Sequence, residues 1–261
     1  MSHFKTDIRL YRNFIDNEYM CQYKYIFTVT SKIDEIYVIY FMFLRTIRRN
    51  FTQDVEIALE SRPNGVYEIF LQRTKRKNAL GKTFMSQLNE ALDKLSTTPE
   101  ARAVILKSKV PGIFCAGADL KERLEMTELE VKAFGLLLRS TFSKIEDLPI
   151  PAIACIEGFA LGGGLEMALA CDLRVATPDS TLGLPETSLA IIPGAGGTYR
   201  LPKLIGQTRA KEMIYTANRY PASQLEKYGK LHSGLLNEVT DKAYERCLEI
   251  ANKIASNVMS S

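Results

Sequence analysis

Two glutamates, Glu166 and Glu186, lie in sequence contexts that suit proton transfer. Glu166 directly follows the stretch 162–165, which reads Gly-Gly-Gly-Leu, and Glu186 lies within 184–187, which reads Leu-Pro-Glu-Thr. A carboxylate at the start of a helix has backbone N–H groups as neighbours, and a carboxylate in an apolar pocket has a raised pKa. Together the two side chains could hold and split a water molecule. We therefore expect them to be the acid/base groups of this chain.

Composition leaves carboxylates as the main candidates for proton transfer. The two histidines are too few for a His-rich zinc site and give little from which to build a Ser-His-Asp triad. The five cysteines are widely spaced and form no CxxC pair, which is typical of a protein from a reducing compartment. The sequence therefore predicts no metal site.

Length and charge indicate an ordinary soluble protein. The 261 residues are 46% hydrophobic and 25% charged, which fits one α/β domain with or without appendages. The formal net charge of +4 results from 34 basic and 30 acidic residues, and it demands neither nucleic acid nor an anionic surface as a partner.

Residues 1–54 read as an atypical extension ahead of a core domain that spans 55–261. The apolar run 36–44 is much shorter than the roughly 20 residues needed to cross a membrane, so we expect a strand or a short core helix there and no membrane span. Arginines at 45, 48 and 49 could be the remnant of an Arg-rich transit sequence, although acidic residues upstream count against one.

From Val55 onward, hydrophobic periodicity predicts alternating strands and helices. Strands 55–60 and 66–71 flank the hairpin signal Asn64-Gly65, and Asn78 is placed to cap a helix that runs to Leu95. The further elements expected are strands 103–106, 152–156 and 173–176 and helices 128–145 and 165–171. Such alternation predicts βαβ crossovers and an α/β fold.

Two loops of small residues follow predicted strands. The first, 114–119, reads Phe-Cys-Ala-Gly-Ala-Asp, and the second, 158–166, reads Gly-Phe-Ala-Leu-Gly-Gly-Gly-Leu-Glu. Taken singly, the first also fits a tight packed turn, and the glycines of the second also fit close packing of a helix on a strand. The second lacks the third glycine of a dinucleotide fingerprint, and the chain has no GxxxxGK[ST] motif, so neither known phosphate loop is expected.

As a pair, the two loops have what an oxyanion hole requires. Each offers a backbone N–H, and the small side chains allow a ligand to approach the backbone closely. The natural donors are Ala118 and Gly163, and the helix that begins near Gly163 adds the positive end of its dipole. These donors would stabilise a thioester carbonyl as it gains enolate character.

Several segments together resemble the enoyl-CoA hydratase/isomerase (crotonase) family. They are 76–80, 114–123, 160–168 and 191–198, the last of which reads Ile-Ile-Pro-Gly-Ala-Gly-Gly-Thr. The likeness runs from about Val55 to about Leu236. Within the family it is closest to the group of methylglutaconyl-CoA hydratase and enoyl-CoA hydratase domain-containing protein 2.

The resemblance implies a fold and a reaction. The fold would be a spiral of ββα repeats that binds acyl-CoA, with Ala118 and Gly163 as the oxyanion pair and with Glu166 and Glu186 on the two catalytic positions. Because many members lack one or both glutamates, their joint presence favours hydration over isomerisation or dehalogenation. The implied activity is reversible addition of water across a 2-enoyl-CoA, with Glu186 as the principal proton donor. CoA is then part of the substrate, and no separate cofactor is expected.

The resemblance also implies where the substrate binds. A basic cluster of Arg73, Lys75, Arg76 and Lys77 would lie near the CoA adenine and phosphates, although a solvated basic turn explains each side chain equally well. The residues assigned to substrate and CoA binding are Arg76, Lys77, Ala79, Ala116, Ala118, Asp119, Leu120, Lys121 and Gly163.

Assembly and location follow from the same resemblance, which implies a homotrimer or hexamer in mitochondria. The family continues for some tens of residues beyond the equivalent of Ser261, into helices that help build the trimer, so a truncated C-terminal helical region is expected.

This leaves an alternative function, that of a catalytically impaired isoform that acts as a subunit or as an RNA-binding module. RNA-binding relatives use a Lys-rich helix, whereas 84–95 carries only Lys94 as a basic residue, which does not favour RNA.

Overall fold

Strands β1 (Ile57–Ser61) and β2 (Val66–Leu71) form the hairpin that the sequence predicts. In the computed structural model, which describes residues 54–225 and 234–258, they pair antiparallel across the short 3-10 turn η2 (Pro63–Gly65). Asn64 and Gly65 both have positive φ, 65° and 77°. Asn and Gly are the residues that tolerate this conformation in tight hairpin turns. The expected extension 1–54 lies outside the described residues apart from Asp54, so its boundary stays a prediction.

From β3 to β8, successive strands alternate between two sheets. The larger sheet has the order β1-β2-β3-β5-β7-β10 and is parallel from β2 onward, whereas the smaller sheet has the order β4-β6-β8-β9 and is parallel from β4 to β8. The strands are β3 (Ala103–Ser108), β4 (Ile113–Cys115), β5 (Ala152–Ile156), β6 (Phe159–Leu161), β7 (Leu173–Ala176), β8 (Thr181–Gly183), β9 (Arg219–Pro221) and β10 (Glu238–Val239). Each successive repeat therefore adds one strand to each sheet, which is the step of a spiral.

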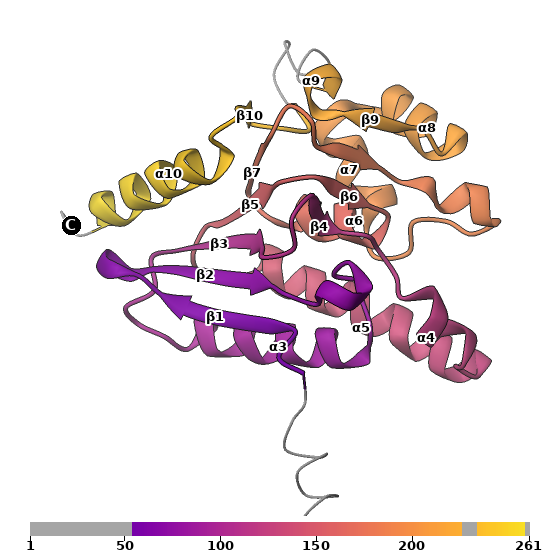
Figure 1. Ribbon diagram of the computed structural model, residues 1–261, viewed down its shortest axis with the longest axis horizontal. Helices are drawn as coiled ribbons and strands as arrows, with labels where there is room; N and C mark the ends of the chain where they lie inside the picture. The colour runs from indigo at the N-terminus through magenta and orange to yellow at the C-terminus, as the bar shows by residue number, and fades with distance from the viewer. Residues whose placement is uncertain (1–53, 226–233, 259–261) are drawn as a thin grey trace, which may run out of the picture. The chain divides into compact units, whose positions relative to one another are not determined.

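Helices connect and cover these strands (Figure 1). They are α3 (Lys82–Ser96), α4 (Leu120–Leu124), α5 (Glu128–Glu146), α6 (Gly163–Ala170), α7 (Gly197–Ile205), α8 (Gln207–Thr216), α9 (Ala222–Leu225) and α10 (Ala243–Val258), with 3-10 turns η3 (Thr74–Arg76) and η4 (Pro185–Leu189). None of the helices within the described residues has the length and apolar character needed to cross a membrane.

The central strands of the larger sheet are buried on both faces. Val104 and Leu106 of β3 join the core that includes α3, whereas Ala103 and Ile105 face the smaller cluster that α10 completes. Figure 1 shows α3 and α10 on opposite sides of these strands. Alternation of side chains along a strand explains the division, and two buried faces explain why β3 and β5 read as continuous apolar runs.

The predicted helix start at Asn78 is wrong. Helix α3 begins at Lys82, and Asn78 is buried with a positive φ of 53°. Its amide group donates to Ser108 Oγ at 2.8 Å and to the Phe114 carbonyl at 2.9 Å. Asparagine favours helix caps and also tolerates the left-handed region, and here the second property decides its place.

Candidate active site

Three predicted site residues follow three neighbouring parallel strands of the smaller sheet. Ala118 comes after β4, Gly163 after β6 and Glu186 after β8. These strands pair in that order, and all three run in the same direction. Because the carboxyl ends of parallel strands lie at one edge, the loops that follow them meet there. The topology thus brings together residues that are far apart in the sequence.

Hydrogen bonds to Leu80 fix the turn that carries Ala118. The Leu80 N–H donates to the Gly117 carbonyl at 2.8 Å, and the Asp119 N–H donates to the Leu80 carbonyl at 3.1 Å. Leu80 and Ala118 thereby form an isolated parallel bridge. In such a bridge the bonds pass through the residues on either side of Ala118, so the N–H of Ala118 itself points away from Leu80.

Gly163 lies directly beside this turn. It is the first residue of α6, so its N–H has no acceptor within the helix and lies at the positive end of the helix dipole. A Cβ on Gly163 would lie 4.0 Å from Ala118 N but only 2.7 Å from Leu80 Cδ1. A Cβ on Gly164 would lie 2.3 Å from the Cys115 carbonyl oxygen. The two turns therefore approach as closely as they do only because these positions lack side chains.

Glu166 is buried and held by a loop from further along the chain. It is 3% exposed, and its Oε1 accepts the N–H of Ala195 at 2.8 Å and that of Gly197 at 2.7 Å. Burial raises the pKa of Glu166, and the two N–H groups and the charge of Arg200 oppose that rise. The sequence interpretation expected backbone donors from the start of α6, the helix of Glu166, but the donors come from the loop before α7 and from the first residue of α7.

Arg200 anchors that loop. Its Nη1 donates to the Ala195 carbonyl at 3.0 Å, and its Nη2 and Nε donate to Glu146 Oε2 at 2.8 and 3.0 Å. Ala195 is near Arg200 in the sequence, whereas Glu146 is 54 residues away, at the end of α5. Sequence reasoning passed over this arginine, because a single Arg in an amphipathic helix carries no signal of its own.

Glu186 lies beside the start of α6. It is 9% exposed, and a Cβ on Gly162 would lie 3.1 Å from its Oε1. Its Oε2 is buried and has no hydrogen-bond partner among the described residues. Burial, with a further contribution from the charge of Glu166, raises the pKa of Glu186 to about 7. The two glutamates thus lie near enough to interact, and near neutral pH Glu186 holds a proton for much of the time.

The raised pKa predicts a pH-dependent stability. Folded Glu186 titrates near 7 and an ordinary Glu near 4.5, so the folded state binds more protons between these values and loses stability as the pH rises through them. Glu186→Gln stays neutral throughout. We expect the variant to melt at a higher temperature than the parent at about pH 8 and at the same temperature near pH 4. Melting curves at both pH values check this, and an equal shift at both would contradict it.

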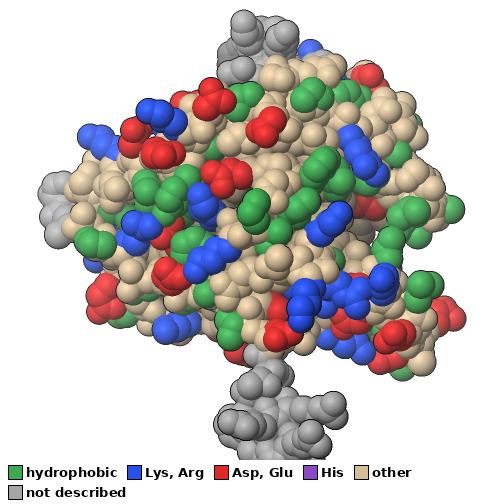
Figure 2. Space-filling view, viewed as in Figure 1, with side chains coloured by type: hydrophobic (Ala, Val, Ile, Leu, Met, Phe, Trp, Pro, Cys, Tyr) green, Lys and Arg blue, Asp and Glu red, His purple; other side chains and the backbone are tan. Residues whose placement is uncertain are grey.

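The residues predicted to bind CoA divide into an exposed and a buried group. Arg76, Lys77, Ala116, Leu120 and Lys121 are exposed, whereas Ala79 and Asp119 are buried and Ala118 is half-buried. Figure 2 shows basic and acidic side chains interleaved on the surface around η3 and α4. The segments 76–79 and 116–121 are joined by a backbone hydrogen bond, in which the Ala116 N–H donates to the Lys77 carbonyl at 3.1 Å. Their role in binding CoA stays a prediction.

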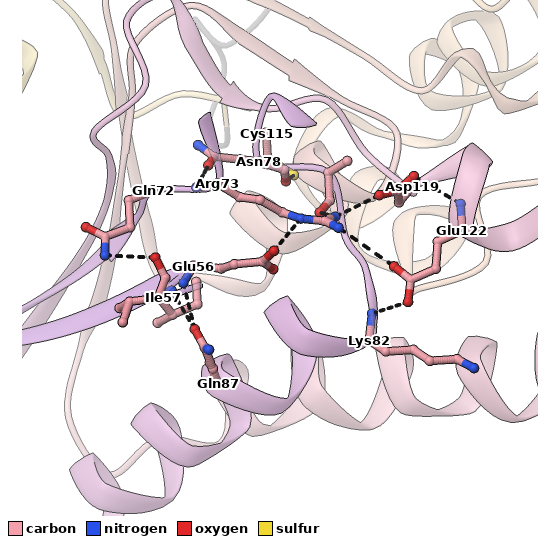
Figure 3. Close-up of polar contacts among 12 residues, drawn as sticks. Glu56, Ile57, Gln72, Arg73, Asn78, Lys82, Gln87, Cys115, Asp119 and Glu122 are labelled. Carbon is pink, nitrogen blue, oxygen red and sulfur yellow. Dashed lines mark hydrogen bonds and ion pairs between the residues drawn. The ribbon is translucent and has the colours of Figure 1, made fainter. Parts of the chain in front are cut away.

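Arg73 and Asp119 differ from the exposed members. Arg73 pairs with Asp119 at 2.9 Å, and Asp119 also accepts the N–H groups of Lys121 and Glu122 at the start of α4, each at 3.2 Å (Figure 3). Both side chains are therefore engaged inside the protein. Grouping Arg73 with the exposed basic residues of its loop, as the sequence suggested, does not match this position.

Comparison with known proteins places the chain in a family. A model of the family described as Enoyl-CoA hydratase/isomerase matches residues 61–260. Mouse mitochondrial enoyl-CoA hydratase domain-containing protein 2 is 45% identical over 205 residues, covering 78% of this chain and 69% of the relative. Mouse mitochondrial methylglutaconyl-CoA hydratase is 44% identical over 214 residues, covering 79% of this chain and 68% of the relative.

A solved structure supports the same placement. The crystal structure of an enoyl-CoA hydratase from Bacillus anthracis is 44% identical and superposes with a TM-score of 0.73, covering 77% of each chain. The predicted crotonase-like α/β spiral is thereby confirmed. The chain belongs to the enoyl-CoA hydratase/isomerase family.

Proposed function

We propose that this protein adds water reversibly across the double bond of a 2-enoyl-CoA thioester. The N–H groups of Ala118 and Gly163 bind the thioester oxygen, and Glu166 and Glu186 hold the water molecule that reacts. One observation carries the proposal: the turns of Ala118 and Gly163 lie against each other, and two buried carboxyls near enough to interact, Glu166 and Glu186, lie beside the same helix start. Family membership and the hydratase relatives support it independently.

The two carboxyls suit different roles. The pKa of Glu186 is raised to about 7, so this carboxyl can hold the proton that passes to C2. Glu166 accepts two N–H bonds and faces the charge of Arg200, which stabilise its ionised form and suit it to take a proton from water as OH adds to C3. The proton lost by water and the proton gained by C2 balance, and the pair returns to its starting state in exchange with solvent.

The N–H pair explains why the proton can leave and return at C2. Adding OH to C3 moves electrons onto the thioester oxygen, and two backbone donors stabilise that developing enolate without any reorganisation. The thioester itself activates the double bond. We therefore propose that no cofactor takes part and that CoA is a carrier within the substrate.

Assay of the purified chain with crotonyl-CoA tests the proposal. Hydration removes the conjugated double bond, so the absorbance of the enoyl thioester should fall and the product should gain the mass of one water. Isomerisation would leave the mass unchanged and would contradict hydration. A panel of straight, branched and glutaconyl thioesters, compared by kcat/KM, then identifies the preferred acyl group.

The competing proposal is a catalytically impaired subunit or an RNA-binding module. It would be favoured by absence of turnover across the whole panel together with RNA binding that weakens steeply with salt.

Sedimentation of the same preparation tests the proposed trimer or hexamer. The relatives' names carry the word mitochondrial, from which we propose the same location, and fractionation of the expressing cells checks it.

A further inference from the structure

Arg73 lies at the centre of a cluster of buried charges (Figure 3). Its side chain is 15% exposed, its Nε is 2.6 Å from Glu56 Oε1, and its Nη1 is 2.9 Å from Asp119 Oδ2. Nη1 also donates to the Ala79 carbonyl at 2.7 Å, and Nη2 lies 3.9 Å from Glu122 Oε2. One guanidinium therefore joins the residue that precedes β1, the turn that leads to α3, and the start of α4.

Asp119 connects this cluster to the proposed oxyanion hole. It directly follows Ala118, and its own N–H donates to the Leu80 carbonyl at 3.1 Å. Its side chain caps α4 by accepting two N–H groups while it pairs with Arg73. The Ala118 N–H belongs to the preceding peptide, which Ala118 shares with Gly117. Arg73 reaches that peptide by a second route, because Nη1 donates to the Ala79 carbonyl, and the N–H of the same peptide, that of Leu80, donates to the Gly117 carbonyl. Loss of the Arg73 contacts would therefore loosen both bonds that hold the Ala118 turn on Leu80.

The cluster has little freedom to rearrange. A Cβ on Gly81 would lie 2.2 Å from Glu122 Oε2 and 2.8 Å from Arg73 Nη1, so the backbone presses directly against the charged groups. Without the guanidinium, the carboxylates of Glu56, Asp119 and Glu122 would lose the cation that they share. Breaking a buried ion pair by removing one partner is strongly unfavourable, and the carboxylates would separate.

We propose that Arg73 is a positioning residue that aims the Ala118 N–H at the thioester oxygen, and that it does not bind the phosphates of CoA. This inference rests on the proposed function, since it assigns Arg73 a task in the same reaction. It replaces the interpretation of Arg73 as one of the CoA-binding cations of its loop. Arg76, three residues further on and exposed, is the matched cation: its charge helps to lower the pKa of Asp119, but it makes none of the close ion pairs that Arg73 makes there.

Two substrates separate positioning from phosphate binding. Crotonyl-CoA carries the adenosine phosphates, and crotonyl-pantetheine lacks them. Arg73→Met should lower kcat by about ten- to hundredfold with both thioesters, because misplacement by about 1 Å costs up to this much. Arg76→Met should instead raise KM for the CoA thioester only. A loss in Arg73→Met that falls on KM and vanishes with the pantetheine thioester would overturn the inference.

Arg73→Lys keeps the test valid if Arg73→Met does not fold. Lysine retains the charge but cannot reach Glu56 and Asp119 together, so a partial loss of kcat with unchanged KM is expected. In a double-mutant cycle, Asp119→Asn should add little to the loss in Arg73→Lys, because the two act through one contact. Full additivity of the two losses would contradict the assignment.

A spectroscopic measurement separates failure of this inference from failure of the proposed function. Bound butyryl-CoA is saturated and cannot be hydrated, but hydrogen bonds to its thioester carbonyl lower the stretching frequency of that bond. The carbonyl stretching frequency of butyryl-CoA should fall when the ligand binds to the parent protein. It should return toward the value in solution when the ligand binds to Arg73→Lys. A parent that hydrates crotonyl-CoA, with a variant that keeps both kcat and the lowered frequency, would overturn the role of Arg73 alone.

Discussion

Glu186→Gln should lower kcat for hydration of a 2-enoyl-CoA by about 10²–10⁴-fold with little change in KM. Glutamine has the same shape as a protonated glutamate but cannot give up a proton to C2. Its side chain still fits beside Gly162, where the carboxyl of Glu186 lies. Steady-state kinetics with crotonyl-CoA measure both constants, and a variant that stays within about tenfold of the parent would remove Glu186 from the mechanism.

The protonation of Glu186 should also set how kcat/KM of the parent protein depends on pH. In the proposed mechanism, the reactive form has Glu186 protonated and Glu166 ionised. Since the pKa of Glu186 is about 7, kcat/KM for hydration should fall as the pH rises above about 7, and it should also fall in acid as Glu166 takes up a proton. The two limbs belong to the pair of carboxyls. A profile that stays level through neutral pH would contradict the assignment of the donor.

Gly164→Ala should abolish most activity and also lower the melting temperature. Its Cβ would lie 2.3 Å from the Cys115 carbonyl oxygen, which belongs to the backbone of β4 and cannot move aside as a side chain would. Relief requires α6 to separate from β4, and this carries the N–H of Gly163 away from that of Ala118. Loss of one such donor costs about 10²–10³ in kcat, and overpacking of a core costs about 1–3 kcal/mol of stability.

Two other glycines provide matched controls for that result. A Cβ on Gly163 would clash only with the end of the Leu80 side chain, at 2.7 Å, so Gly163→Ala should lose less stability than Gly164→Ala. A Cβ on Gly135, within α5, would meet nothing within 4 Å, so Gly135→Ala should stabilise the helix by about 0.5–1 kcal/mol and leave kcat unchanged. Equal melting temperatures for Gly164→Ala and the parent would show that the helix and strand do not press together here.

Local patterns predicted most of the fold. The bounds of β2, β5 and β7 follow directly from apolar runs, and the Asn64-Gly65 signal identified the hairpin, because these features depend on near neighbours in the sequence. The loops around Ala118 and Gly163 were also evident, since closely approaching backbones exclude large side chains.

Long-range partners could not be predicted in the same way. Glu166 bonds to amides 29 and 31 residues away, and Arg200 bonds to a glutamate 54 residues away. Nothing in the sequence near Arg73 distinguishes it from the exposed cations beside it. Its pairing with Glu56 and Asp119 exists only after three separate segments have been brought together.

The order of the smaller sheet has a consequence for how such a chain can change its chemistry. Ala118, Gly163 and Glu186 are carried by independent turns on a shared scaffold of β4, β6 and β8. A substitution in the third turn would remove the proposed acid and leave the proposed anion-stabilising pair intact. In the proposed mechanism, stabilisation of the enolate is therefore separable from its protonation, and altering one turn would change the reaction while the architecture is retained.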